Sequence, residues 1–116
     1  MRASPLSYWL ASAPPFTGGA EGGVEGKADV AIIGGGFTGL SAALALAKRG
    51  ARVVLLEAGR VVGEASGRNG GQCNNGTAHD YGALSAKFGK DTAKAWYRAH
   101  CDAVDTVERL AREEGI

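Results

Sequence analysis

The clearest hydrophobic pattern lies between residues 28 and 57, where two apolar runs flank a periodic segment. The runs at 28–33 and 52–57 carry apolar side chains at consecutive positions, which is typical of strands buried in a parallel sheet. Between them apolar residues recur at helical spacing, and Gly50 provides a stop signal. A strand, a helix and a strand within about 30 residues predict a βαβ unit with a right-handed crossover.

The first 27 residues show no such periodicity. They hold all three prolines of the chain and several glycines, a composition that does not propagate a helix or a buried strand. Residues 1–27 are therefore predicted to form an extended leader and a flexible joint. We expect Tyr8, Trp9 and Leu10, the large apolar residues of this leader, to dock on a surface that another segment provides.

The C-terminal half is read as a loop followed by one long helix. Residues 58–82 are glycine-rich and are expected to be irregular, whereas helical periodicity with one apolar face returns from about Thr92 and ends at Gly115. Two parallel strands with uncovered faces do not make a stable sheet. The fold class predicted is therefore α/β with an incomplete parallel sheet, in which residues 28–116 form the N-terminal portion of a larger domain.

Composition and charge limit the classes of function. Alanine and glycine make up about a third of the 116 residues, and Leu, Ile, Val and Phe only about a fifth, so the core is expected to be thin. The net charge of +1, without a block of one sign, argues against a nucleic-acid partner. No apolar run is long enough for a membrane span, and a signal peptide is disfavoured. Two cysteines and two histidines suggest neither a disulfide framework nor a metal site, and favour a cytoplasmic location.

A phosphate-binding loop is predicted where the first strand meets the helix. Residues 34–39 fit the pattern GxGxxG, in which Gly34 allows a tight turn, Gly36 lets backbone approach a pyrophosphate and Gly39 lets the helix pack close to the strand. Glu57 ends the next strand. At this position an acidic side chain accepts hydrogen bonds from a ribose diol, and it disfavours NADP because it repels a 2′-phosphate. The pattern alone fits both NAD and FAD, and the plainer alternative is a tight turn followed by an exposed glutamate.

A second glycine-rich loop follows at 64–72. This loop follows closely after Glu57, the residue expected to contact the ribose. It could therefore contact the part of a cofactor that extends beyond the ADP group. Arg68 is a candidate partner for phosphate or for negative charge on a flavin ring, and Asn69 and Gln72 are candidates for the polar ring edges. The alternative is that all three are solvated loop residues.

Three segments resemble the start of FAD-dependent oxidoreductases of the D-amino-acid oxidase family. They are residues 29–39, 54–59 and 65–72, and the Ala-Ser-Gly-Arg-Asn-Gly-Gly-Gln run of the third segment is the most specific. Within that family, the gamma-glutamylputrescine oxidoreductases are the group most similar to this chain. They share an aromatic leader like Ser7-Tyr8-Trp9 and the run Gly-Gly-Gly-Phe-Thr-Gly-Leu-Ser at 34–41.

The resemblance implies an enzyme that holds FAD along a Rossmann-like βαβ unit and oxidises a C–N bond of a small amine or amino acid by hydride transfer to the flavin. Carried over to this sequence, the cofactor-binding residues are Gly34, Gly36, Phe37, Thr38, Gly39, Glu57, Ala58, Ser66, Arg68, Asn69, Gly70 and Gln72. The separate substrate domain of the family has no counterpart here, so an N-terminal fragment, inactive alone, is expected. Two alternatives remain open, a fragment of an NAD-dependent dehydrogenase and a non-catalytic nucleotide-binding module.

No residue is assigned as a catalytic acid, base or nucleophile. His79 is read as a surface residue rather than a general base, and Cys73 as an ordinary small residue rather than a reactive thiol. His100, Trp96 and Tyr97 are read as packing residues of the last helix. The oligomeric state and the electron acceptor are not specified by any motif.

Overall fold

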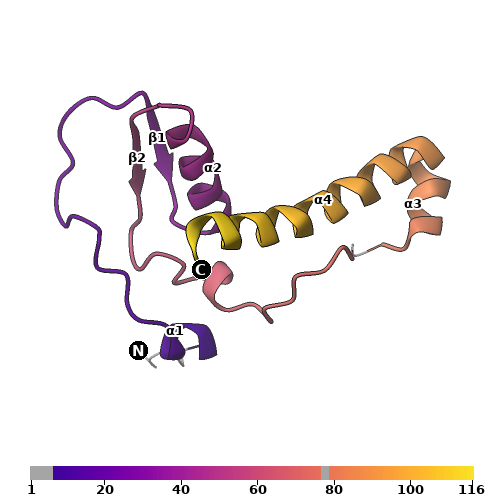
Figure 1. The fold of residues 1–116 in the computed structure, drawn as a ribbon, viewed down its shortest axis with the longest axis horizontal. Coiled ribbons are helices and arrows are strands. Elements are labelled where there is room, and N and C mark those ends of the chain that lie inside the picture. Colours follow the sequence, from indigo (N-terminus) through magenta and orange to yellow (C-terminus); the bar gives the residue numbers. More distant parts are fainter. Residues whose placement is uncertain (1–6, 77–78) are drawn as a thin grey trace. The chain divides into compact units, whose positions relative to one another are not determined.

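The computed structural model describes residues 7–76 and 79–116, which form two compact units that divide at Gly70. The first unit contains α1 (Tyr8–Ser12), β1 (Val30–Ile33), α2 (Phe37–Ala47), β2 (Val53–Leu56) and the short 3₁₀ turn η1 (Ala65–Gly67) (Figure 1). The second contains α3 (Tyr81–Phe88) and α4 (Lys90–Glu114). The part of the predicted leader at 1–6 lies outside the described residues.

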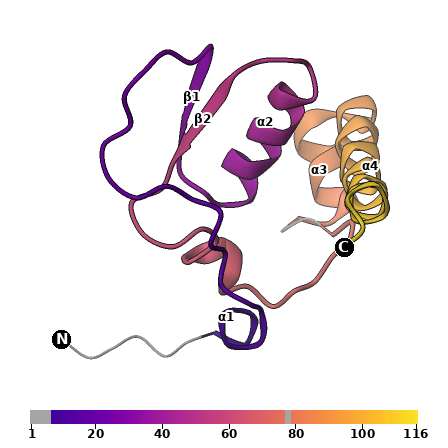
Figure 2. The ribbon, with the colours of Figure 1, turned by 60° about the vertical axis from the view of Figure 1, so that its left-hand side comes forward.

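The strand–helix–strand arrangement of the first unit is confirmed. β1 and β2 pair in parallel, with Val30 opposite Val53 and Ile33 opposite Leu56, and α2 packs against the strand pair (Figure 2). Both strands are shorter than predicted. Backbone pairing nevertheless continues past their ends, because the Gly34 N–H donates to the Leu56 carbonyl at 2.8 Å.

Few side chains of the described residues cover the two-stranded sheet, in keeping with the thin core that the composition predicts. Ile33 at the end of β1 is 89% exposed and Leu56 at the end of β2 is 41% exposed. Among the described residues, the buried hydrophobic side chains are Leu84 and Ala93, both in the second unit. Each apolar group left in water forgoes about 25 cal/mol per Å² of burial, so the first unit depends strongly on its backbone hydrogen bonds and close glycine contacts.

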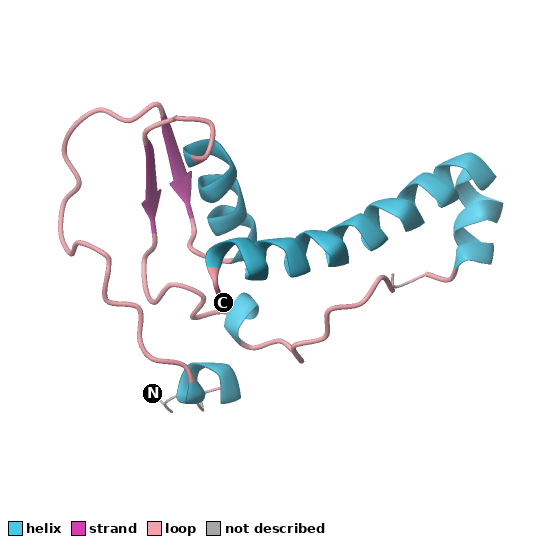
Figure 3. Cartoon of the chain, viewed as in Figure 1, coloured by secondary structure: helices cyan, strands magenta, loops and turns pink. Residues whose placement is uncertain are grey.

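The leader differs from the prediction, because residues Tyr8–Ser12 form a turn of helix instead of extended chain. Ser7 begins it as an N-cap, with its side chain accepting a hydrogen bond from the Leu10 N–H, which satisfies one unpaired donor of the first turn. The chain between α1 and β1 forms one long loop (Figure 3). Pro14, Pro15 and the glycines thus fall after the helix and do not prevent it.

The second unit is a helix pair. α3 was not predicted, since residues up to 82 were expected to be irregular, and it begins at the N-cap Asp80, whose Oδ1 accepts from the Ala83 N–H at 2.8 Å. α3 and α4 pack against each other, and each carries one buried hydrophobic side chain, Leu84 in α3 and Ala93 in α4. The predicted long helix is confirmed, begins two residues earlier than expected, and ends at Gly115 in the left-handed conformation.

Candidate functional site

The loop after β1 adopts the geometry expected of a tight strand-to-helix turn. Gly34 has a φ of 101°, a conformation that L side chains rarely adopt. Gly39, in the first turn of α2, lies so close to this turn that a Cβ atom built there would be 1.9 Å from the Gly34 carbonyl oxygen. Glycine at these two positions therefore lets α2 begin directly against the end of β1.

Glu57 lies beside this loop, at the end of β2. Its Oε2 accepts a hydrogen bond from the Gly35 N–H at 2.7 Å, and its Oε1 accepts from the Gly59 N–H at 2.9 Å. These two backbone donors favour the ionised form, so the pKa of the Glu57 carboxyl is held below its usual range, Gly35 being the larger cause. The side chain is exposed and is a fixed carboxylate at neutral pH.

Ser66 reaches the same loop from η1. Its hydroxyl oxygen accepts a hydrogen bond at 3.0 Å from the N–H of Phe37, the first residue of α2. Gly36, the N-cap of α2, has no side chain to provide this bond. A Cβ atom built on Gly36 would lie 2.9 Å from the Ser66 hydroxyl, so the glycine also makes room for this contact.

Arg68 and Asn69 hold their own loop together. The Arg68 Nε donates to the Gly63 carbonyl at 3.0 Å, and the Asn69 side-chain amide donates to the Ser66 carbonyl at 2.6 Å. Arg68 also lies 3.9 Å from the Glu64 carboxylate, a loose and exposed ion pair. Both side chains are exposed at the surface of the first unit.

The structure thus gathers most of the predicted site residues at one end of the β1–β2 pair. Thr38 is exposed in the first turn of α2, Ala58 is exposed directly after Glu57, and Gly70 ends the first unit. Gln72 belongs to the second unit and is exposed there. The roles of all these residues toward a cofactor remain predictions.

Sequence reasoning missed Val62. Its N–H donates to the Gly35 carbonyl at 2.9 Å, which ties the segment after β2 to the loop after β1. Val62 has a φ of 52°, and it is the one residue other than glycine with a positive φ within 7–76 and 79–116. A β-branched residue strongly disfavours this conformation, so no sequence signal points to the turn.

The chemistry of this donor set fits the ADP part of a dinucleotide. Beyond the Phe37 N–H, which donates to Ser66, the start of α2 offers further backbone N–H groups and the positive end of the helix dipole, and Gly36 and Gly39 add no side chains there. The Glu57 carboxylate has about four lone-pair sites, of which the two backbone donors use two. It therefore retains capacity to accept hydrogen bonds from hydroxyl groups of a ligand.

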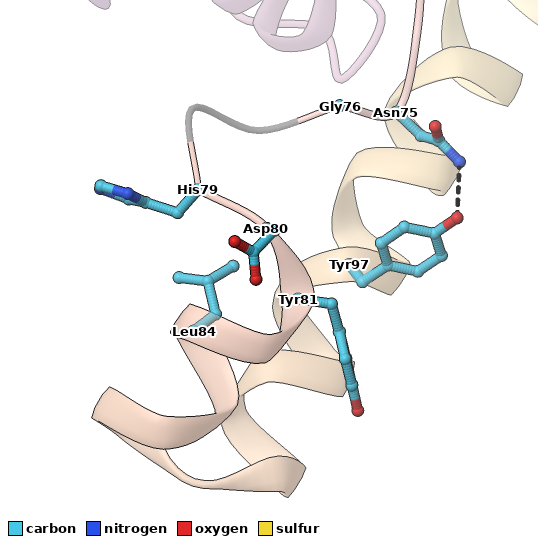
Figure 4. A pocket seen from close by; sticks show the side chains of 7 residues that line it. All are labelled: Asn75, Gly76, His79, Asp80, Tyr81, Leu84 and Tyr97. Carbon is cyan, nitrogen blue, oxygen red and sulfur yellow. Dashed lines mark hydrogen bonds between the residues drawn. The ribbon is translucent and has the colours of Figure 1, made fainter.

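The second unit contains a separate hollow of about 220 Å³ between the start of α3 and the first half of α4. Figure 4 shows Asn75 donating to the Tyr97 hydroxyl, at 3.0 Å, while the His79 ring points away from this pair. Asp80 is engaged as the α3 N-cap.

The other residues weighed in the sequence have structural surroundings. The His100 ring stacks on Trp96, and its Nδ1 lies 2.9 Å from the Trp96 carbonyl oxygen, in keeping with a packing role. Cys73 is an exposed free thiol, and the thiol of Cys101 is also free. Over 7–76 and 79–116, no three His, Cys, Asp or Glu side chains are grouped so as to hold a metal ion. In the same ranges, no helix combines the length and apolarity needed to cross a bilayer.

Comparisons with known proteins place these observations in a family. The model of a family described as FAD dependent oxidoreductase matches residues 29–116. The chain is 62% identical over 90 residues to a probable oxidoreductase OrdL of Rhizobium meliloti and 44% identical over 88 residues to the gamma-glutamylputrescine oxidoreductase of Escherichia coli. These matches cover 78% and 76% of this chain but only 21% of each relative, so the chain spans about a fifth of the length of these proteins. No solved structure matches the chain.

Proposed function

Because the chain belongs to the family of FAD-dependent oxidoreductases, whose cofactor is FAD, we propose that residues 28–72 form the ADP-binding part of an FAD site. The observation that carries the proposal is the Glu57 carboxylate, held by two backbone N–H groups directly beside the glycine loop after β1. A fixed acceptor next to a glycine-lined helix start is the combination that a ribose joined to a pyrophosphate needs.

In this proposal each residue acts through the group that the structure shows. The backbone of the Gly34–Gly39 loop and the N–H group of Thr38 bind the pyrophosphate, next to the Phe37 N–H that donates to Ser66. Glu57 accepts hydrogen bonds from the adenosine ribose, and Ala58 lies beside it without a side chain that blocks access. Ser66, Arg68, Asn69, Gly70 and Gln72 line the cofactor further along, toward the flavin.

FAD, when bound, supplies the acceptor for the two electrons removed from a C–N bond, and we propose an amine or amino acid as the substrate class. The name of the Escherichia coli relative supports a gamma-glutamylputrescine-like compound, and so a role in putrescine breakdown. A cytoplasmic location is part of the same proposal. No residue of this chain is assigned as a catalytic residue, so the chain's own contribution is to bind and orient the cofactor.

A flavin fluorescence titration tests the proposal. We expect the chain to quench FAD fluorescence and ADP to compete for the site. Glu57→Gln should weaken FAD binding by about 10-fold or more, because hydrogen bonds to a charged acceptor contribute about 1.5–3 kcal/mol. Glu64→Gln is the matched control, since the Glu64 side chain is 91% exposed and makes only the 3.9 Å ion pair with Arg68.

Two results would refute the proposal. One is wild-type chain that binds no FAD while its circular dichroism spectrum shows folded helices. The other is an equal loss of affinity in Glu57→Gln and Glu64→Gln, because a non-specific charge effect would then explain both variants.

A further inference from the structure

The leader helix α1 lies beside η1, the turn that begins the second loop of the proposed FAD site (Figures 1 and 2). We propose that α1 acts as a clamp that fixes the backbone of residues 66–69, and that Ser7 and Trp9 are positioning residues of the FAD site. This inference rests on the proposed function, because the clamp matters for FAD only where that loop contacts the cofactor.

Two side chains of the leader make the polar contacts of the clamp. The Ser7 hydroxyl donates to the Gly67 carbonyl while accepting from the Leu10 N–H, so one group both begins α1 and joins it to η1. The Trp9 indole Nε1 donates to the Asn69 carbonyl at 2.8 Å. Both acceptors lie 60 residues away in the sequence, so these are tertiary contacts and not local turn geometry.

The two accepting carbonyls lie on either side of Arg68. Fixing the peptide plane before Arg68 and the one after Asn69 limits the backbone torsions of the two residues between them, and so the direction of the Arg68 side chain. The Asn69 amide in turn holds the Ser66 carbonyl at 2.6 Å. Ser66, Gly67 and Asn69 are thus each hydrogen-bonded either to the leader or to a residue that is.

Close packing accompanies these hydrogen bonds. Gly67 is buried, and a Cβ atom built on it would lie 3.3 Å from the Leu10 Cδ2 and 1.9 Å from the Val62 carbonyl oxygen. A glycine at this position lets α1 on one side and the turn at Val62 on the other approach the same backbone. The Arg60 guanidinium adds a longer contact of 3.4 Å to the Leu10 carbonyl.

The clamp is connected to the dinucleotide loop through Ser66. Its hydroxyl accepts from the Phe37 N–H, at the start of α2, where the pyrophosphate is proposed to bind. A loop released from α1 has more freedom at Ser66 and Arg68, and FAD then has to order it on binding. The entropy of that ordering weakens the affinity without removing any direct contact to the cofactor.

Matched pairs of variants in α1 test this inference on the full chain. Trp9→Phe removes the indole donor but keeps an aromatic ring, and Tyr8→Phe is its control because Tyr8 is 73% exposed and its edge-to-face ring contact with Trp9 survives. Ser7→Ala removes the shared hydroxyl. Ser12→Ala is its control because the Ser12 hydroxyl donates only within α1, to the Tyr8 carbonyl.

Two measurements are made on each variant. The first is the rate of tryptic cleavage after Arg68 in the absence of FAD, followed by mass spectrometry, which reports the loop without reference to the cofactor. The second is the Kd for FAD by fluorescence. We expect Trp9→Phe and Ser7→Ala to raise the cleavage rate about 3- to 10-fold and to weaken FAD binding by a similar factor, as one or two lost hydrogen bonds imply.

The outcomes separate the clamp from the function on which it rests. Unchanged cleavage in Trp9→Phe and Ser7→Ala overturns the clamp, as does faster cleavage with an unchanged Kd for FAD. Equal effects in the control variants also overturn it, because general weakening of α1 then suffices. Wild-type chain that binds no FAD refutes the proposed function itself, whatever the cleavage rates.

Discussion

Replacement of Gly39 by alanine tests the close approach of α2 to β1 most directly. The added Cβ would lie 1.9 Å from the Gly34 carbonyl oxygen, whereas real Cβ atoms essentially never come within 3.0 Å of such an atom, so the start of α2 has to move by roughly 1 Å. Overpacking of this kind costs about 1–3 kcal/mol. The better helix propensity of alanine offsets about 1 kcal/mol of this cost, so we expect a net loss of up to about 2 kcal/mol.

The same displacement should weaken FAD binding. The Thr38 N–H, and the Phe37 N–H that holds Ser66, lie in the part of α2 that has to move, and misplacing these two hydrogen-bond donors should cost about 2 kcal/mol, or roughly 30-fold in Kd. Urea unfolding followed by circular dichroism gives the stability, and fluorescence titration gives the Kd. Gly23→Ala is the control, because nothing lies within 4 Å of a Cβ built at Gly23.

The result that refutes this reasoning is a Gly39→Ala chain with the wild-type unfolding midpoint and the wild-type Kd for FAD. Such a chain would show that α2 and β1 do not approach as closely as the built Cβ indicates. A loss of stability with an unchanged Kd would instead separate the packing of α2 from the binding of the pyrophosphate.

Three further predictions follow from single side chains. The pKa of Glu57 is lowered in the folded chain, so the stabilisation of the fold by its ionised form is present above about pH 4.5 and is lost as the pH falls through the lowered pKa. We expect the FAD affinity of the wild-type chain to fall in this pH range. An equal fall in Glu57→Gln would contradict the assignment. Asp29→Asn should lower the free energy of unfolding, measured in urea, by no more than about 1 kcal/mol. The ion pair that Asp29 forms with Arg52 at 3.0 Å is solvent-screened, since the Arg52 side chain is 69% and the Asp29 side chain 47% exposed, and a larger loss would contradict this reasoning. Asp80→Ala should cost about 1 kcal/mol and speed amide hydrogen exchange over 81–88, whereas the exposed Asp105→Ala should change neither.

The sequence was informative where local chemistry alone decides the structure. Consecutive apolar residues predicted β1 and β2, and Gly50, with a φ of 85°, ends the turn after α2 as its position indicated. The prediction of an FAD-binding family is confirmed by the family match over residues 29–116. In these places side-chain type and backbone conformation are directly linked, so a pattern of residues is sufficient.

The parts that were missed depend on contacts between residues distant in sequence. α1 has five residues, too few for a stable isolated helix, and it is held by carbonyl groups of residues 67 and 69. Val62 adopts a conformation that its own side chain opposes, so only the surrounding contacts determine it. α3 had one local signal, the capping residue Asp80, and a single capping residue is common in loops as well.

The 60-residue separation between Ser7 and Gly67 also sets an order of events during synthesis. At about 5–20 residues per second, a ribosome adds the residues that hold α1 roughly 3–12 s after Ser7 itself. During that interval the leader has none of its partners, and its two adjacent aromatic rings, Tyr8 and Trp9, are open to chaperones or to a peptide fused at the N-terminus.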